Sequence, residues 1–268
     1  DEMFGGYNRY IYAEKLWKFI NSQSAINLRF LNYLIKSISE KNINNLYKII
    51  YTLGLTKINV NNPGQIIKKA SNLLNSSSQD ELYKNIITIF PNIENLVNHS
   101  MHNNFEKNLK NSNKKINFYE YMNLYDTKNY LTDDILCKVD RASMRHSLEV
   151  RVPFINKEIF SHAWKIPLKY KVRENQGKII LKDILNKRIP KELFVRPKSG
   201  FAIPIDDLIR NDLGKTVSEV LEKNKIEDQN IFNFNEIKKL ISAHNSGINN
   251  GHKIWNLFIF QQWHDTWH

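Results

Sequence analysis

Cysteine, glycine and proline are scarce in this 268-residue sequence, and each scarcity excludes a class of protein. A single cysteine, Cys137, cannot form an intramolecular disulfide or a cysteine-based zinc site. Only nine glycines and seven prolines are present, which argues against a protein of short strands and turns. No apolar run could span a membrane and no signal peptide is recognisable, so we expect a protein of the reducing cytoplasm.

Apolar side chains recur at spacings of three and four, which is typical of amphipathic helices. Hydrophobic residues make up 41% of the sequence and aromatic residues 12%, enough for a packed core, so we expect a mainly α protein. Helices are predicted for residues 7–20, 25–39, 43–54, 63–74, 176–186 and 252–267. The last of these carries an aromatic stripe that predicts a buried helix: Trp255, Phe258, Phe260 and Trp263.

The net charge of +12 would suit nucleic acid, an anionic membrane surface or an enzyme that handles nucleotide phosphates. Lysine is spread along the chain instead of being gathered in one block, as a composition rich in lysine and asparagine would also produce. Charge alone therefore does not choose among these partners.

The first seven residues, Asp-Glu-Met-Phe-Gly-Gly-Tyr, place two carboxylates and a glycine pair directly before a predicted helix. A glycine pair permits close approach of the backbone to another group. Because so dense a motif stands at the very front and Asp1 is not a start methionine, we expect the chain to be truncated there.

Acidic and basic side chains crowd the segment that follows Phe118, from Asp126 to Arg151. Thr132 is predicted to cap a helix over residues 133–147, with Asp133 and Asp134 in its first turn.

Proline and asparagine mark the end of this charged segment. Glu149 and Arg151 are predicted to form a buried pair beside Pro153, and Asn156 to cap a helix over residues 157–164.

A loop near residue 200 presents cations around a proline, in the run Arg196, Pro197, Lys198, Ser199 and Gly200. A rigid turn that presents cations before a glycine is suited to binding an anion, although surface loops of this kind are common.

Taken together and in order, three segments of the sequence resemble the asparagine synthetase family of ATP-dependent amidotransferases, which includes β-lactam synthetases and lasso-peptide cyclases. Residues 1–7 are similar to the end of that family's Ser-Gly-Asp-Gly-x-Asp-Glu-Leu-Phe-Gly-Gly-Tyr motif. Residues 131–154 resemble its helical signature, and Arg-Pro-Lys-Ser-Gly-Phe at 196–201 resembles its third motif. The tryptophan-rich end resembles its closing helix.

The resemblance implies a fold, a domain plan and a reaction. The chain would be the helical C-terminal portion, residues 1–268, of an adenine-nucleotide-hydrolase-like (PP-loop ATPase) synthetase domain whose parallel sheet is mostly missing. Residues 21–115 would be a helical insert and residues 116–268 the acceptor-side region. The implied reaction is activation of an aspartate carboxylate by ATP and Mg²⁺ to an acyl-adenylate, which glutamine-derived ammonia converts to asparagine.

Site residues follow from the resemblance position by position. Asp1 would hold magnesium with pyrophosphate and Glu2 would support it in the cofactor site, although both could instead be carboxylates at a helix start. Lys198 would stabilise the charged transition states, or remain a solvated loop lysine. Arg196 would contact phosphate, or fix the loop to a helix end.

Asp134 is the family's implied acidic residue at the acceptor, with Asp133 as a competitor for that role. The alternative for both is helix capping.

The family's Ser-Gly-Gly-x-Asp-Ser pyrophosphate loop and its glutaminase domain, with a nucleophilic first cysteine, are not in this sequence. We therefore expect the chain alone to be inactive. Oligomerisation is common in such enzymes, and no motif here decides it.

Two alternative functions remain open from the sequence. An amidotransferase acting on a surface-polysaccharide sugar acid or a peptide carboxylate would carry the same motifs. A non-catalytic basic helical module would instead bind nucleic acid or another protein, with salt-sensitive affinity.

Overall fold

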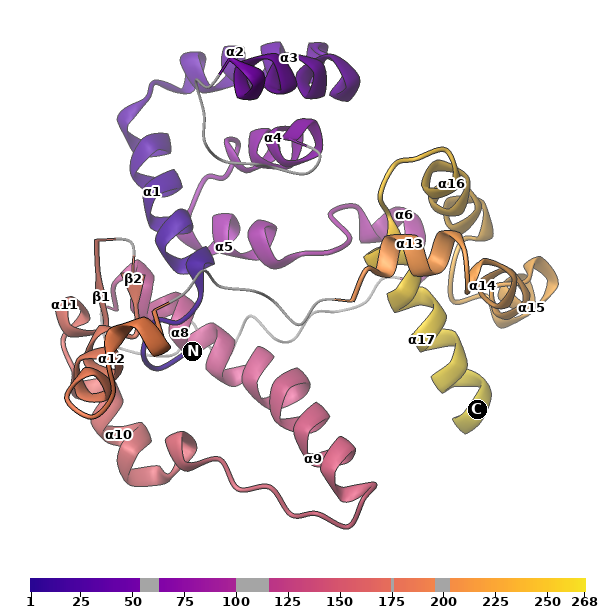
Figure 1. Cartoon of the computed structure of the whole chain (residues 1–268). Coiled ribbons are helices and arrows are strands. Elements are labelled where there is room, and N and C mark those ends of the chain that lie inside the picture. The colour runs from indigo at the N-terminus through magenta and orange to yellow at the C-terminus, as the bar shows by residue number, and fades with distance from the viewer. Residues whose placement is uncertain (54–62, 100–115, 175, 196–202) are drawn as a thin grey trace. The chain divides into compact units, whose positions relative to one another are not determined.

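The computed structural model describes residues 1–53, 63–99, 116–174, 176–195 and 203–268. The described chain is mainly helical with one small two-stranded sheet, which confirms the predicted helical character (Figure 1). Within the described residues, no helix is both long and apolar enough to cross a membrane.

The chain divides into two compact units. Unit 1 comprises Asp1–Ile87 and Asn111–Val195, and unit 2 comprises Thr88–Lys110 and Arg196–His268. The predicted subdivision into residues 21–115 and 116–268 stays a prediction.

Unit 1 contains most of the described helices and both strands of the sheet. Its elements are α1 (Asn8–Ser22), α2 (Ala25–Ser37), α3 (Glu40–Thr52), α4 (Pro63–Leu73), α5 (Gln79–Ile87), α8 (Phe118–Lys128), the π-helix η2 (Tyr130–Leu136), α9 (Cys137–Met144), the 3₁₀ turn η3 (Pro153–Ile155), α10 (Lys157–Lys165), α11 (Leu168–Lys171), β1 (Val172–Arg173), β2 (Gln176–Gly177), α12 (Ile179–Asn186) and the 3₁₀ turn η4 (Lys191–Leu193).

The main core of unit 1 lies where α1 packs against α5 and α8. Tyr10, Tyr83 and Met122, one from each of these helices, have no exposed surface. Burying aromatic side chains of this size is a large favourable term in folding, and their hydroxyls then need hydrogen-bond partners. The three helices thus enclose a polar interior as well as an apolar one.

The segments η2 and α9 follow after Asn129, which is the C-cap of helix α8. A capping box begins α8, because Asn117 Oδ1 accepts from the Glu120 N–H at 2.9 Å while Glu120 Oε2 accepts from the Asn117 N–H at 3.0 Å. The predicted N-cap at Thr132 is wrong, since Thr132 lies inside η2 and its hydroxyl donates to the Lys128 carbonyl at 2.8 Å.

A short antiparallel hairpin leads into α12. Val172 pairs with Gly177 and Arg173 with Gln176. The helix predicted from residue 176 therefore begins three residues later, because Gln176 and Gly177 belong to the hairpin. The predicted cap of α10 is confirmed: Asn156 Oδ1 accepts from the Glu158 N–H at 2.9 Å.

The described elements of unit 2 are α6 (Ile93–Leu96), α13 (Ile205–Arg210), α14 (Gly214–Val220), α15 (Lys223–Gln229), α16 (Phe234–Asn245) and α17 (Gly251–Trp267). Helix α17 packs against α13, α14 and α16 (Figure 1). Its buried face is formed by Ile254, Leu257, Phe258 and Gln261.

The closing helix α17 is confirmed as an element, but the prediction that its aromatic stripe is buried is only partly right. Phe258 is buried, whereas Trp263 is 49% exposed. The aromatic residues form one stripe of the helix, but the stripe that packs against α13, α14 and α16 is a different one.

Candidate functional site

The first residues of the chain form a tight turn that brings its carboxylates together. The Gly6 N–H donates to the Asp1 carbonyl at 2.8 Å, and Gly5 has φ of +69°, a conformation that side chains with a Cβ rarely adopt. Met3 and Phe4 are buried against Ala163, which fixes the turn in the apolar interior of unit 1.

The hairpin and the start of α12 lie directly against this turn. A Cβ placed on Gly177 would overlap the Gly5 carbonyl oxygen, so the approach requires glycine at this position. The Lys178 N–H then donates to the Phe4 carbonyl at 3.0 Å. Two segments that are far apart in the sequence are thereby fixed side by side.

Lys178 turns its ammonium group toward the Asp1 carboxylate and forms an ion pair with it. The Lys178 backbone has φ of +60°, a left-handed conformation that residues with a Cβ adopt far less often than glycine. The two side chains are 40% and 33% exposed, so a ligand from solvent could reach them. Burial lowers the pKa of Lys178, and the nearby negative charge of Glu2 opposes that shift.

Glu2 is buried beside this ion pair. The Tyr7 hydroxyl donates to Glu2 Oε1 at 2.8 Å, while Glu2 Oε2 lies 3.3 Å from the backbone nitrogen of Asp1. Burial and the bond to Glu2 raise the pKa of Tyr7 above its ordinary value, so its hydroxyl remains a donor.

Behind Tyr7, an arginine is held between aromatic rings. The Arg9 guanidinium carbon lies 4.2 Å from the centroid of the Tyr7 ring and 4.9 Å from that of Tyr130. Such contacts favour a cation because the ring face carries negative electrostatic potential. Arg9 also donates to Asp126 Oδ2 from Nη2 at 2.6 Å and from Nε at 3.2 Å.

Asp126, on α8, is 1% exposed and accepts hydrogen bonds from side chains on two helices, α1 and α5. The hydroxyls of Tyr10 and Tyr83 each donate to its Oδ2 at 2.6 Å. Burial raises the pKa of both tyrosines, and the Asp126 charge raises it further. A buried carboxylate is stable only when it is paired and hydrogen-bonded, and these donors meet that requirement.

Among the predicted site residues, Asp1 and Glu2 lie together in this turn. Asp134 is exposed on η2, and its charge helps to raise the pKa of Tyr130, after the larger effect of burial. Asp133 instead accepts from the Thr132 hydroxyl at 2.9 Å. Of the two aspartates, Asp134 is therefore the one coupled to the ring beside Arg9. Arg196 and Lys198 lie outside the described residues.

The predicted pair of Glu149 and Arg151 forms, with 2.8 Å between Arg151 Nε and Glu149 Oε1. The prediction that it is buried is wrong, because these side chains are 68% and 87% exposed.

Lys178 is the residue that the sequence reasoning missed. The available signal was a Gly-Lys pair at the start of a predicted helix, a pattern that allows close backbone approach beside a cation. Arg9 and Asp126 were noticed only as part of an amphipathic helix and of a charged segment, because nothing local indicates that they pair.

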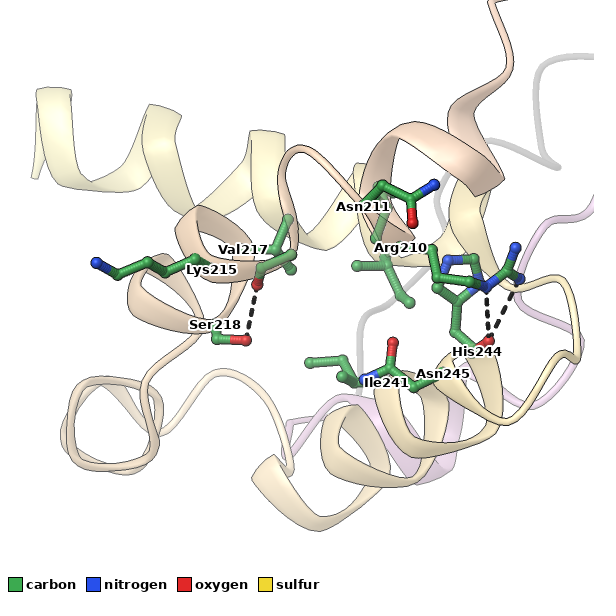
Figure 2. A pocket seen from close by; sticks show the side chains of 11 residues that line it. Arg210, Asn211, Lys215, Val217, Ser218, Ile241, His244 and Asn245 are labelled. Carbon is green, nitrogen blue, oxygen red and sulfur yellow. Dashed lines mark hydrogen bonds between the residues drawn. The ribbon is translucent and has the colours of Figure 1, made fainter.

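Unit 2 holds a cavity of about 610 Å³ that is lined by both polar and apolar side chains, seen from close by in Figure 2. Its lining residues are Ile209, Arg210, Asn211, Gly214, Lys215, Val217, Ser218, Ile241, His244, Asn245 and Ile254. Two of its polar groups already serve the fold: Ser218 Oγ donates to the Gly214 carbonyl at 2.8 Å, and Arg210 Nε donates to the His244 carbonyl at 3.3 Å. The lining contains no carboxylate, so it does not match the predicted chemistry.

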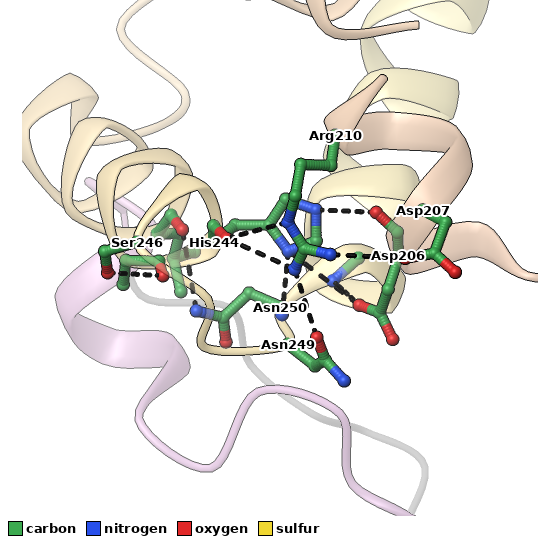
Figure 3. Close-up of polar contacts among 10 residues, drawn as sticks. Asp206, Asp207, Arg210, His244, Ser246, Asn249 and Asn250 are labelled. Atoms are coloured by element: carbon green, nitrogen blue, oxygen red, sulfur yellow. Dashed lines mark hydrogen bonds and ion pairs between the residues drawn. The ribbon is translucent and has the colours of Figure 1, made fainter. Parts of the chain in front are cut away.

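A polar cluster around His244 joins α13, α16 and the start of α17 (Figure 3). The Asn250 N–H lies 3.2 Å from His244 Nδ1, which must therefore accept, so Nε2 carries the hydrogen and donates to the Asp206 carbonyl at 3.0 Å. Asp206 Oδ1 in turn accepts from the Gly251 N–H at 2.8 Å. These contacts are ones that fix helices to each other.

Comparison with known proteins supports the same family as the motif of residues 1–7. A family model described as asparagine synthase matches residues 1–265. Asparagine synthetase (glutamine-hydrolyzing) 1 of Bacillus subtilis is 30% identical over 144 residues, which are 53% of this chain and 22% of that protein. The human asparagine synthetase (glutamine-hydrolyzing) is 31% identical over 96 residues, 35% of this chain and 17% of that protein. The aligned part of the chain thus spans about a fifth of these relatives, and no solved structure matches.

Proposed function

Because the chain belongs to the asparagine synthase family, we propose that it forms part of the synthetase site of an ATP-dependent ligase that converts aspartate to asparagine. The observation that carries the proposal is the ion pair of Asp1 and Lys178, held beside the buried Glu2 at a tight backbone turn. This arrangement offers a carboxylate and an ammonium group to the same small volume.

The proposed reaction has two steps. An oxygen of the acceptor carboxylate attacks the α-phosphorus of ATP, which forms an acyl-adenylate as the bond to pyrophosphate breaks. Ammonia from glutamine then attacks the acyl carbon, the bond to AMP breaks, and the ammonia nitrogen loses a proton. Negative charge builds on phosphate oxygens in the first step, so fixed cations lower its barrier.

Lys178 is suited to that charge. Its ammonium group is compact, half-exposed and fixed at the turn. With phosphate present, the ammonium group can exchange the Asp1 carboxylate for a phosphate oxygen. The Asp1 carboxylate is then available to a cation.

Asp1 and Glu2 fit a magnesium ion that arrives with phosphate. Among the described residues there is no group of three or more side chains able to hold a metal ion by themselves. Magnesium bound with nucleotides commonly takes only one or two protein carboxylates, and its other ligands are phosphate oxygens and water. Bound there, Mg²⁺ would neutralise the charge of the leaving pyrophosphate.

Further residues complete the proposal. Lys198 would stabilise the transition states and Arg196 would contact phosphate, while Asp134 would face the amino group or protons of the acceptor. The parallel sheet of a PP-loop ATPase and a glutaminase domain would complete the synthetase, and a cytoplasmic protein would meet all of these substrates.

The test is product analysis with the full-length protein, ATP, Mg²⁺, aspartate and either glutamine or ammonium. We expect asparagine, AMP and pyrophosphate in equal amounts. Amidation of a sugar acid or a peptide carboxylate, with aspartate ignored, would assign the other acceptor class. Absence of AMP formation with all acceptors, together with salt-sensitive binding to nucleic acid, would replace the enzyme by a basic binding module.

A further inference from the structure

Glu2 contributes to the proposed metal and phosphate site from a buried position, and the Tyr7 side chain fixes the orientation of its carboxylate. The Tyr7 hydroxyl donates to Glu2 Oε1 at 2.8 Å, which leaves Oε2 on the side of Asp1, 3.3 Å from its backbone nitrogen. Rotation of the Glu2 carboxylate away from Asp1 would break the bond to Tyr7. The orientation of Glu2 therefore depends on where the Tyr7 ring is held.

The Tyr7 ring is itself confined by its neighbours. Arg9 covers its face at 4.2 Å, and the rings of Tyr10 and Tyr130 form T-shaped pairs with it, with centroids 5.5 Å and 5.9 Å away. Edge-to-face packing and a cation on the face both favour this one ring position. Of these neighbours, Arg9 carries the charge and has the longest side chain, so it needs an anchor of its own.

Asp126 is that anchor. Two nitrogens of the Arg9 guanidinium donate to the same oxygen of Asp126, at 2.6 Å and 3.2 Å, although the two residues are 117 positions apart. The hydroxyls of Tyr10 and Tyr83 bind this oxygen too, so Asp126 is fixed from α1 and α5 at once. Charge-assisted hydrogen bonds to a buried group are among the strongest in proteins.

We propose that Asp126, acting through Arg9 and Tyr7, positions the Glu2 carboxylate for the metal and phosphate site. The inference rests on the proposed function, because it assigns to this network a role at that same site. Asp126, Arg9 and Tyr7 are positioning residues, since each acts on Glu2 and none touches a reacting atom. A network with a purely structural role would contribute to stability without any effect on metal binding.

The experiment uses the full-length protein with the variant Tyr7→Phe, which keeps the ring and removes only the hydroxyl. Tyr121→Phe is the matched control, because Tyr121 also donates its hydroxyl to a carboxylate, that of Asp80, in unit 1. Binding of Mn²⁺ in the presence of pyrophosphate is measured by electron paramagnetic resonance, and Tm is measured in parallel. The apparent Mg²⁺ constant for amide formation is a third readout.

We expect Tyr7→Phe to weaken Mn²⁺ binding about 10-fold, in the range found for groups that orient metal ligands, and to raise the apparent Mg²⁺ constant in step. Tyr121→Phe should lower Tm to a similar extent and change Mn²⁺ affinity by less than about twofold. Asp126→Asn, which keeps the shape of the side chain but not its charge, should also weaken Mn²⁺ binding.

Two results would overturn the inference in different ways. Equal Mn²⁺ affinity in wild type and Tyr7→Phe would reduce the network to a structural role and leave the proposed function standing. Failure of the wild-type protein to bind Mn²⁺ with pyrophosphate would overturn the proposed function, and this inference with it.

Discussion

Each unit of this protein has a buried polar cluster that ties several helices together, and the two clusters are built differently. In unit 1, Asp126 is bound by side chains, namely two tyrosine hydroxyls and an arginine. In unit 2, His244 is bound by backbone groups on both ring nitrogens. The Asp126 cluster continues through Tyr7 to Glu2, whereas the His244 cluster ends where the helices meet.

The difference shows what separates a cluster that supports chemistry from one that supports packing. When both nitrogens of a neutral imidazole pair with backbone groups, the ring has no further hydrogen bond with which to position another side chain. A buried carboxylate needs charged and hydroxyl donors, and those donors are side chains that can hold further groups in place. The half-exposed pair of Asp1 and Lys178 lies at the end of the first cluster.

The largest expected effect on stability is that of Asp126→Ala. It leaves Arg9 without its carboxylate and two buried tyrosine hydroxyls without an acceptor, so the free energy of unfolding should fall by about 3 to 5 kcal/mol. Urea denaturation measures this change. Asp140→Ala, on the exposed surface of α9, is the control and should stay within about 0.5 kcal/mol of wild type. A loss below about 1 kcal/mol for Asp126→Ala would contradict the description of this cluster.

A smaller effect is expected for His244→Ala. The change leaves the Asn250 N–H and the Asp206 carbonyl without a partner and opens a small cavity, so about 2 to 3 kcal/mol should be lost. His252→Ala, exposed at the start of α17, is the matched control for urea denaturation. Mn²⁺ affinity in the presence of pyrophosphate should not change in either variant. A weakened affinity in His244→Ala would remove the distinction between the two clusters.

The smallest expected effect on stability concerns Lys171, a buried cation in unit 1. Its ammonium group lies over the Trp164 ring and is not hydrogen-bonded to a carboxylate of the described residues. Burial lowers the pKa of Lys171, and the charge of Glu120 only partly opposes this. Between that lowered value and the ordinary lysine pKa of about 10.4, the unfolded chain binds more protons than the folded one. The stability of wild type should therefore rise with pH in that window.

Lys171→Met lacks the titrating group, so its stability relative to wild type should be greatest near pH 8 and decline toward pH 10.5. Urea denaturation over this range measures the difference. The exposed Lys169→Met serves as control and should show no such trend. A difference between Lys171→Met and wild type that stays constant with pH would show that burial of Lys171 carries no charge penalty.

The sequence predicts the helices of this protein better than it predicts which residues lie next to one another in space. The helix over residues 7–20 and the Asn156 cap follow from local periodicity and capping chemistry, and both are found. Thr132 has the local features of an N-cap, yet it lies within a π-helical segment. A wider helical turn has no periodic signature that distinguishes it from a new helix start.

The candidate site could be predicted only in part for a related reason. Asp1 and Glu2 are adjacent in the sequence and belong to one recognisable motif. Lys178 reaches Asp1 because Gly177 permits the hairpin to touch the Gly5 carbonyl, and the Gly-Lys pair alone does not indicate which segment it approaches. The same holds for Arg9 and Asp126, which pair across 117 positions.

The assignment of Asp1 and Lys178 to an ATP-dependent amide-forming site is tested by the amide-formation assay on Lys178→Ala. The matched control is Lys187→Ala, which changes an exposed lysine at the end of α12. We expect Lys178→Ala to lower kcat/KM of the full-length protein by about 100- to 1000-fold, with Lys187→Ala within about twofold of wild type. Turnover in Lys178→Ala equal to that of the control would contradict this assignment.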